Sequence, residues 1–383
     1  MTAADAPAFA VTALTVAQFR SHAAARLTLD GRPAAFFGPN GSGKTNLLEA
    51  VSMLSPGRGL RRAKAEELAR TPGGEGWRVR ADVRTPEGLR EAVVGAGPDG
   101  RKSVEIDGKP AAQAALGALA PMLWLTPAMD RLWIESAEGR RRFLDRATLS
   151  FVPDHAGAAA AYEKAMRERN RLLRDDVRDP AWLGALEARM AETGAAMARA
   201  RVLAVTRLTA AQNDARTLFP KAEISIIGTM EERIAEAVAT GADEPDCAAW
   251  LAEALARGRG EDAAAGRALT GPHRSDLAAV YAEKGVEARL CSTGEQKALL
   301  VSLVLGNARA LAAERGAAPL LLLDEVAAHL DADRRAALHD ELCALGAQAW
   351  MTGVGPEAFD TLGDRAQRFA VAQGAEGSVL TPA

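Results

Sequence analysis

Residues 38–45 read GPNGSGKT and directly follow the apolar residues 34–37. This segment matches G-x-x-x-x-G-K-[ST] at every fixed position. Its glycines allow successive backbone N–H groups to converge on phosphate oxygens, and a helix starting behind the loop adds the positive end of its dipole. Apolar spacing in residues 46–54 predicts that helix. We therefore expect a strand, a loop and a helix that bind a nucleoside triphosphate; the alternative is an ordinary glycine-rich turn.

The side chains of this loop have separate expected roles. Lys44 is expected to reach the β- and γ-phosphates, and Thr45 is expected to ligate Mg²⁺. The other candidate nucleotide-binding residues of the loop are Gly38, Asn40, Gly41, Ser42, Gly43 and Asn46. The expected cofactors are therefore ATP and Mg²⁺.

Four consecutive leucines at residues 320–323 predict a buried parallel strand, and two carboxylates follow it directly. We expect Asp324 to hold Mg²⁺ through water and Glu325 to orient or deprotonate the attacking water. With Lys44, they are the candidate catalytic residues. The alternative is an Asp-Glu pair favoured at a helix N-terminus by the helix dipole. The presence of the glycine loop elsewhere in the chain favours the catalytic interpretation.

Residues 291–297 read CSTGEQK and open a helical stretch at residues 298–311. Ser292 and Gly294 at the helix start would make a second anion site, with Glu295 in the first turn. Taken alone, this pattern is also an ordinary N-cap. Its place about thirty residues before the Asp-Glu strand resembles the signature of ABC-type ATPases. That resemblance implies that Ser292, Gly294 and Glu295 cap the γ-phosphate of a partner copy, in an ATP-dependent head-to-tail homodimer.

The hydrophobic periodicity divides the 383-residue chain into two kinds of segment. Strands are expected at residues 13–17, 26–29, 34–37, 77–83, 90–94, 103–106, 277–281 and 287–291. Helical patterns dominate from residue 127 to residue 267, with long helices at 156–174 and 181–218. We therefore predict an α/β ABC-type ATPase head, with a mixed sheet, built from residues 1–126 and 268–383. Residues 127–267 would form an inserted all-helical domain.

The formal net charge is −3, so a polyanion would need a local basic patch. Arg58, Arg61, Arg62 and Lys64 place four positive charges within seven residues, as a candidate DNA contact or as a solvated turn. A second cluster, residues 140–146, carries four arginines that could equally form internal ion pairs. Three widely spaced cysteines and the lack of a long apolar run favour a cytoplasmic protein without membrane segments.

Several segments, taken in order, resemble the RecF family of bacterial recombination mediators, which is related to SMC-type ATPases. The resemblance runs nearly from end to end of the chain. Its segments are residues 18–21 (QFRS), 43–50 (GKTNLLEA), 55–61 (SPGRGLR), 141–145 (RRFLD), 169–173 (RNRLL), 271–276 (GPHRSD) and 324–331 (DEVAAHLD). Residues 352–355 read TGVG and depart from the family, so the residue that would sense the γ-phosphate there is left unassigned.

The resemblance implies an ATP-dependent DNA clamp. It would dimerise on ATP, bind DNA at single-strand gaps or junctions, and support recombinase loading together with recombination mediator proteins in repair, replication and the SOS response. Slow, DNA-stimulated ATP hydrolysis would release it. ABC-type folds also suggest that Phe19 and Arg20 face the adenine. His273 and Arg274 would lie near the dimer seam or the DNA face, or would simply form a turn before the strand at 277–281, and His329 would be a packing residue; none of the three is assigned a firm role.

Three other functions share some of these sequence features. A nucleotide-binding subunit of a transporter shares the loop and the Asp-Glu strand. It usually has a histidine about thirty residues after that strand, however, where this chain reads MTG at residues 351–353. A structural SMC-type protein would need heptads sustained over hundreds of residues, and this sequence contains no such stretch. A nucleotide-binding regulator without DNA remains open, and it predicts no stimulation of ATP hydrolysis by gapped DNA.

Overall fold

The computed structural model describes residues 7–71, 75–177, 179–243, 245–328 and 330–383. The chain divides into two compact units. The first comprises Met1–Asp130, Ala215–Pro220 and Thr293–Ala383, and the second comprises Arg131–Asp214 and Lys221–Ser292. The predicted first boundary at 126/127 lies close to this division. The second boundary lies 25 residues beyond the predicted 267/268, because residues 276–287 pair with a strand of the second unit.

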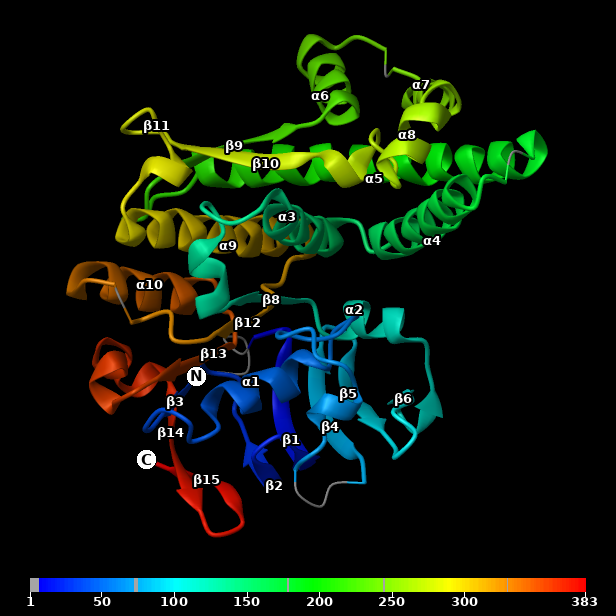
Figure 1. Cartoon of the computed structure of the whole chain (residues 1–383). Coiled ribbons are helices and arrows are strands. Elements are labelled where there is room, and N and C mark those ends of the chain that lie inside the picture. Colours follow the sequence, from blue (N-terminus) through cyan, green and yellow to red (C-terminus); the bar gives the residue numbers. More distant parts are fainter. Residues whose placement is uncertain (1–6, 72–74, 178, 244, 329) are drawn as a thin grey trace. The chain divides into compact units, whose positions relative to one another are not determined.

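The first unit contains two six-stranded sheets (Figure 1). One sheet is antiparallel, in the order β2-β1-β4-β5-β6-β7. Its strands are β1 (Ala10–Phe19), β2 (His22–Thr28), β4 (Trp77–Thr85), β5 (Gly88–Ala96), β6 (Lys102–Ile106) and β7 (Lys109–Pro110). The expected strands at 13–17, 26–29, 77–83, 90–94 and 103–106 all overlap strands of this sheet, so they are confirmed.

The second sheet contains the strand that leads into the predicted phosphate-binding loop. Its order is β15-β14-β3-β13-β12-β8, and all its pairs are parallel except β14 with β15. The strands are β3 (Ala34–Phe37), β8 (Met122–Leu125), β12 (Leu320–Leu323), β13 (Ala349–Gly353), β14 (Gln367–Gly374) and β15 (Gly377–Pro382). The leucines of β12 are all buried, as expected of a strand with neighbours on both sides and layers on both faces.

One apolar core is shared by the two sheets and α1 (Lys44–Ser52). Phe36 of β3 stacks between Trp350 and Phe369 from the flanking strands, at ring-centroid distances of 5.3 and 5.2 Å. The unit also contains the short helix α2 (Leu116–Leu119), α9 (Thr293–Arg315) and α10 (Ala332–Ala344). Because β3 is central and its side chains are locked by this packing, the loop that follows it has a rigid base.

The second unit is mostly helical. Its helices are α3 (Ala137–Phe151), α4 (His155–Arg174), α5 (Pro180–Asn213), α6 (Thr229–Thr240), α7 (Cys247–Arg257) and α8 (Arg259–Ala265). The prediction of an all-helical insertion is wrong in one respect, because β9 (Ala222–Ile227) lies within residues 127–267 and pairs with β10 (Asp276–Tyr281). The third strand, β11 (Val286–Glu287), is short, and a 3₁₀ turn (Ala288–Leu290) replaces the rest of the strand expected at 287–291.

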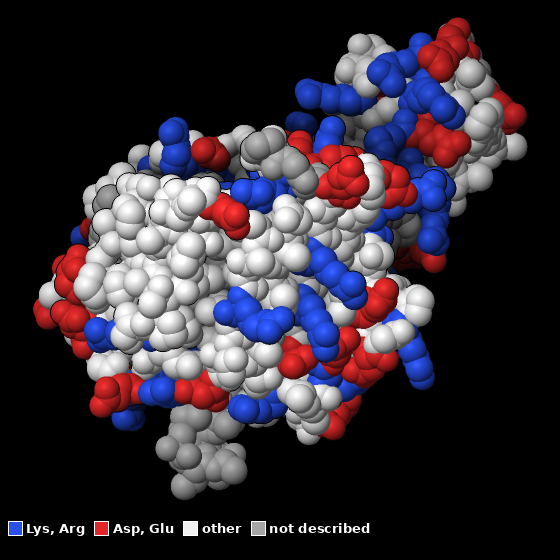
Figure 2. All heavy atoms as spheres, turned by 90° about the horizontal axis from the view of Figure 1, so that it is seen from below, with Lys and Arg blue, Asp and Glu red and all other residues white. Residues whose placement is uncertain are grey.

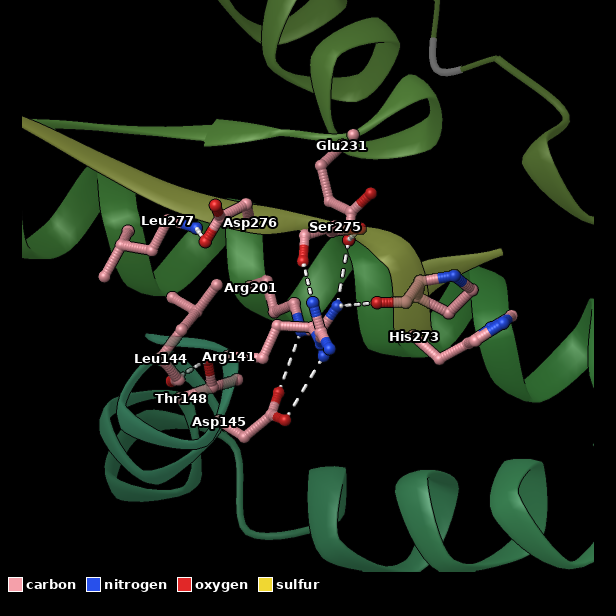
Figure 3. Close-up of polar contacts among 12 residues, drawn as sticks. Arg141, Leu144, Asp145, Thr148, Arg201, Glu231, His273, Ser275, Asp276 and Leu277 are labelled. Atoms are coloured by element: carbon pink, nitrogen blue, oxygen red, sulfur yellow. Dashed lines mark hydrogen bonds and ion pairs between the residues drawn. The ribbon is translucent and has the colours of Figure 1, made fainter. Parts of the chain in front are cut away.

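A buried arginine joins four segments of the second unit (Figure 3). Arg201 of α5 is only 1% exposed, and its guanidinium donates to both oxygens of Asp145 on α3, at 2.8 and 3.2 Å. It also donates to Glu231 of α6 at 3.1 Å and to the carbonyl of Pro272 at 2.7 Å. Glu231 in turn accepts a hydrogen bond from Ser275. Segments separated widely in the sequence therefore share one polar centre.

The arginine cluster at residues 140–146 makes internal contacts. Arg140 forms a bidentate pair with Asp276 at 2.7 Å, and Arg141 donates to the carbonyl of Ser275 at 2.8 Å. Arg142 pairs with Glu138 one turn earlier on α3. Of the two sequence interpretations, these contacts support internal ion pairing for this cluster.

Candidate nucleotide-binding site

The glycine loop connects β3 to α1, as the sequence predicted. Gly38 follows the last residue of β3, and its N–H donates to the carbonyls of Gly353 and Val354 at 3.3 and 3.2 Å. The helix begins at Lys44 behind Gly43, which has φ +104°. The N-terminus of α1 thus lies at the end of the loop, where unpaired helix N–H groups favour an anion.

Two of the loop glycines are required by their surroundings. Gly38 has φ +154°, and a Cβ there would lie 2.0 Å from the carbonyl oxygen of Val371. A Cβ on Gly43 would lie 2.2 Å from the Oγ of Ser378. In contrast, Gly41, with φ +80°, has no atom within 4 Å of its Cβ position. The ends of the loop are tightly packed, and its middle faces open space.

Lys44 lies across the loop. Its ammonium group donates to the carbonyls of Gly38 and Pro39 at 2.6 and 2.9 Å, and the residue is 4% exposed. Burial lowers the pKa of Lys44, while the nearby carboxylates of Glu325 and Asp324 oppose that shift. The cation is therefore held at the loop mouth within electrostatic reach of both carboxylates, where a phosphate would be a stronger partner than the two carbonyls.

Thr45 and Asp324 meet although 279 residues separate them in the sequence. The Thr45 hydroxyl donates to Asp324 Oδ1 at 2.9 Å, and Asp324 is 4% exposed at the end of β12. The Asp324 N–H donates to the carbonyl of Leu125 at 2.9 Å, which continues the pairing of β12 with β8. The parallel strands thus bring a hydroxyl and a carboxylate, both oxygen ligands suited to Mg²⁺, to the same edge of the sheet.

Thr352 ties the two carboxylate residues together. Its hydroxyl donates to Asp324 Oδ1 at 2.7 Å and accepts from the Glu325 N–H at 2.8 Å. Glu325 has φ +52°, which is uncommon for a residue with a side chain, and the bond from its N–H holds that backbone in place. Sequence reasoning left Thr352 unassigned. Leu323 of β12 pairs with Met351 of β13, so the residues that follow them, Asp324 and Thr352, lie side by side. A hydroxyl residue at the end of an apolar strand was therefore the signal that could have identified Thr352.

Further residues form hydrogen bonds with the end of the loop and the start of α1. The buried ring of His22 bonds through Nε2 to the carbonyl of Gly43 at 3.1 Å, and burial lowers the pKa of His22, which favours the neutral ring. Asn46 donates to the Ser21 hydroxyl at 2.8 Å, and Ser378 donates to the same hydroxyl at 2.7 Å. Sequence reasoning missed Ser21, His22 and Ser378 in this role, because nothing in the local sequence links them to the loop.

Ser42 offers an uncommitted polar atom in the loop. It is 2% exposed, and its hydroxyl oxygen has no hydrogen-bond partner among the described residues. A buried hydroxyl usually has a partner, so this atom fits a role as a ligand-binding group. Together with the open space at Gly41, it supports the fit of a phosphate group to this loop.

The expected adenine contacts are partly contradicted. Phe19 is fully buried and packs edge-on against Trp77 at a centroid distance of 5.4 Å, so it is a core residue. Arg20 forms a bidentate pair with the buried Glu49, at 2.9 and 3.0 Å, and also donates to the carbonyl of Glu67. Arg20 is therefore held by Glu49 and the neighbouring loop.

All four cations of the candidate DNA-binding cluster are exposed, and Arg61 also bonds to side chains of α1. Arg61 donates to Asn46 at 2.9 Å and lies 3.4 Å from Glu49, which joins it to α1. Arg58, Arg62 and Lys64 are exposed. On the face shown in Figure 2, basic and acidic side chains are interspersed, in agreement with the net charge of −3.

The candidate signature starts α9. The helix begins at Thr293, directly after the exposed Ser292, and Gly294 and Glu295 lie in its first turn. Further along the helix, the buried Lys297 donates to the carbonyl of Ala328 at 2.9 Å and lies 3.3 Å from Asp130. The helix start thus lies at the surface of this chain. His329 lies outside the described residues.

Comparison with known proteins decides the family. A family model described as RecF/RecN/SMC N terminal domain matches residues 10–374. A protein named DNA replication and repair protein RecF from Rhizobium rhizogenes is 46% identical over 376 residues, covering 95% of this chain and 97% of that protein. The chain belongs to the RecF family. A RecF from Mesorhizobium japonicum is 47% identical over 375 residues, covering 96% and 97%.

Solved structures share the fold of this RecF-family chain. A structure described as the recombination mediator protein RecF-ATP in the RecFOR pathway has a TM-score of 0.83 at 23% identity, covering 99% of this chain and 98% of that one. An Smc head domain from Pyrococcus furiosus has a TM-score of 0.55 at 17% identity, covering 98% and 96%. These likenesses show the ABC/SMC-type ATPase fold. In the described part of this RecF-family chain, no helix has the length and apolar character to cross a membrane.

Proposed function

We propose that this chain is an ATP-dependent, DNA-binding recombination mediator that acts in DNA repair, replication and the SOS response. The carrying observation is the convergence of Lys44, Thr45 and Asp324, with a 2.9 Å hydrogen bond joining the loop to the carboxylate strand. Family membership supports the same function, because the close relatives carry the name DNA replication and repair protein RecF. Membership of the RecF family also favours this function over that of a transporter subunit.

The loop residues fit Mg²⁺ and ATP. Gly38, Asn40, Gly41, Ser42 and Gly43 would surround the phosphates with backbone N–H groups and the Ser42 hydroxyl, while Lys44 would turn from its two carbonyls to the phosphate oxygens. Thr45 and Asp324 would hold Mg²⁺, which neutralises phosphate charge when bound. Asn46, which bonds to Ser21, would keep the start of α1 in place.

Glu325 is the proposed general base for ATP hydrolysis. Its backbone is held by Thr352, and its carboxylate lies close enough to Lys44 to affect the pKa of that lysine. Glu325 would orient the attacking water or take its proton, and Lys44 and Asp324 would stabilise the charge that develops on the phosphates. We propose slow, DNA-stimulated hydrolysis that acts as a switch and releases the protein from DNA.

The ATP-bound state would be a head-to-tail homodimer. Ser292, Gly294 and Glu295 of one copy would approach the γ-phosphate bound by the other, because the start of a helix with exposed N–H groups is an anion site. Both nucleotides would then lie between the two copies. ATP bound by each copy would therefore drive formation of the dimer.

DNA at single-strand gaps or junctions is the proposed partner, together with recombination mediator proteins, in the cytoplasm. Among the first cluster, Arg58, Arg62 and Lys64 are available for phosphate contacts. Arg61 is joined to Asn46 and Glu49, so it would connect such contacts to the nucleotide loop.

The decisive experiment measures molecular mass by light scattering with ADP, with ATP, and with ATP plus a gapped duplex. We expect monomers with ADP and dimers with ATP. Lys44→Ala should stay monomeric with ATP because it loses the phosphate contact, and Ser292→Arg should bind ATP as a monomer without assembling. Dimers of either variant with the same ATP dependence as the parent protein would refute the proposed arrangement.

A further inference from the structure

One face of α4 carries a row of exposed cations. Lys164, Arg167, Arg171 and Arg174 are spaced by three, four and three residues, so they lie on one side of the helix and span about 15 Å. The opposite side of α4 is buried in the core of the second unit, and Tyr162 is its largest apolar contributor. The helix therefore presents its basic side to solvent.

These four cations line a concave depression of about 580 Å³. Glu168, Asn170 and Gly266 complete its wall. Asn170 accepts a hydrogen bond from the Ala268 N–H at 2.9 Å, and Gly266 ends α8 with φ +67°. We call this depression the α4 groove. It lies entirely within the second unit, so one copy of the chain contains the whole groove.

Internal acids neutralise the groove only weakly. Arg167 lies 3.4 Å from Glu163, and Arg171 lies 3.9 Å from Glu168, which also lines the groove. Arg167, Arg171 and Glu163 are more than half exposed, and exposed pairs of this kind contribute about 0–1 kcal/mol. Within the described residues, Lys164 and Arg174 take part in no ion pair. The groove keeps a net positive charge in a chain whose overall charge is −3.

The buried side of α4 holds the groove in a fixed shape. Arg169 is fully buried and donates to Glu187 of α5 at 3.0 Å, to Asp262 of α8 at 2.6 Å and to the carbonyl of Leu255 at 2.8 Å. These bonds fix α4 against the helices beside it. The exposed cations therefore project from a rigid element, which lowers the entropy lost on binding a ligand.

We infer that the α4 groove binds the phosphate backbone of duplex DNA. A row of four cations over about 15 Å matches a polyanion that carries one charge per about 1.7 Å of duplex axis. The groove lining is basic and polar, which suits phosphates, so the contact would be independent of base sequence. This inference rests on the proposed DNA-binding function and adds a surface remote in sequence from Arg58, Arg62 and Lys64.

The test is DNA affinity of the full chain, measured by fluorescence anisotropy with a gapped duplex at several salt concentrations. The first variant replaces Lys164, Arg167, Arg171 and Arg174 with Gln. The matched control replaces four other exposed cations of the second unit with Gln, all of them in local ion pairs: Arg131, Arg189, Arg257 and Arg289. Both variants lose the same total charge, so a general field effect would act on both.

We expect the groove variant to bind at least tenfold more weakly than the control. Its slope of log affinity against log salt should also fall by about 3 to 4, since each lost phosphate contact removes about 0.9. Equal affinities of the two variants would overturn the inference, as would loss of affinity without a change in the salt slope. If the fourfold variant does not fold by circular dichroism, Lys164→Gln with Arg174→Gln replaces it, because neither residue is in an ion pair with a described residue.

The nucleotide site can be separated from the groove. Lys44→Ala should still bind duplex DNA as a monomer through the α4 groove, and adding the groove substitutions to it should weaken that binding further. If the parent protein binds no DNA under any nucleotide condition, the proposed function fails. If the parent binds DNA and the groove variant binds equally well, only the groove inference fails.

Discussion

Replacing Arg201 with Met should destabilise the second unit strongly. Arg201 is buried and donates to Asp145, Glu231 and the carbonyl of Pro272. Methionine fills much of the same volume, but it leaves two carboxylates and a carbonyl without their shared donor. Removing one partner of a buried ion pair costs about 3–5 kcal/mol, because the other charge stays desolvated. We expect a loss in the lower half of that range, since Asp145 keeps His155 and Glu231 keeps Ser275.

The dependence on pH gives this prediction a second readout. Burial raises the pKa of Asp145, but the hydrogen bond from His155 and the charge of Arg201 outweigh it and hold that pKa below its ordinary value. A carboxyl with a depressed pKa stabilises the fold above its unfolded pKa, and this stabilisation is lost as pH falls through the folded pKa. The difference between Arg201→Met and the parent protein should therefore be largest near pH 7 and shrink below about pH 4.

The assay is urea unfolding followed by circular dichroism at pH 7 and at pH 3.5. The matched control is Arg189→Met, because Arg189 lies on the same helix, is more than half exposed and forms a local ion pair with Glu192, so its loss should change the free energy of unfolding by less than about 1 kcal/mol. A loss below about 1 kcal/mol for Arg201→Met at pH 7 would refute the reasoning, because it would mean that the buried carboxylates do not depend on this guanidinium.

Four other perturbations test the nucleotide site and its surroundings. Thr352→Val should lower the free energy of unfolding by about 1–3 kcal/mol and slow single-turnover ATP hydrolysis, because the Glu325 N–H loses its acceptor. Thr352→Ser keeps the hydroxyl and should leave both properties as in the parent protein. A Val variant with unchanged stability and hydrolysis would contradict the role of the hydroxyl. Glu325→Gln should trap ATP-bound dimers, and normal turnover would remove it from the catalytic role. Gly38→Ala should abolish ATP binding in a filter assay, because the new Cβ would lie 2.0 Å from a backbone oxygen, and unaltered binding would show that the loop tolerates the shift. Burial lowers the pKa of His339 to about 4, so its stabilisation should be lost as pH falls from about 6.5 towards 4, by at most about 3 kcal/mol; a His339→Gln variant with the same pH profile would disprove this.

The elements next to the site were predictable because their signals are local. Residues 34–37 form a short apolar run followed by a glycine loop, and residues 320–323 form one followed by two carboxylates. Both runs are strands of one mostly parallel sheet. The helix expected at 156–174 is α4 almost residue for residue. Each of these patterns lies within a stretch of consecutive residues, so periodicity and turn chemistry were enough to detect it.

The errors came from pairing between distant segments. The strand expected at 277–281 was assigned to the ATPase head, whereas β10 pairs with β9 in the second unit. The helix expected to reach residue 218 ends at Asn213, because the chain turns there towards β9. Phe19 looked available to a ligand but packs against Trp77. In each case a tertiary contact, which no local pattern records, decided the outcome.

The sequence by itself determined the family and located the candidate nucleotide loop and the carboxylate pair, because these depend on residue types at fixed short spacings. Only the tertiary structure decided that Thr352 joins Asp324 to Glu325, that Arg201 links four segments, and that the cations of α4 line a groove. The physical reason is that hydrogen bonds and ion pairs between segments require specific distances, and those distances are set by how strands and helices pack rather than by their order in the chain.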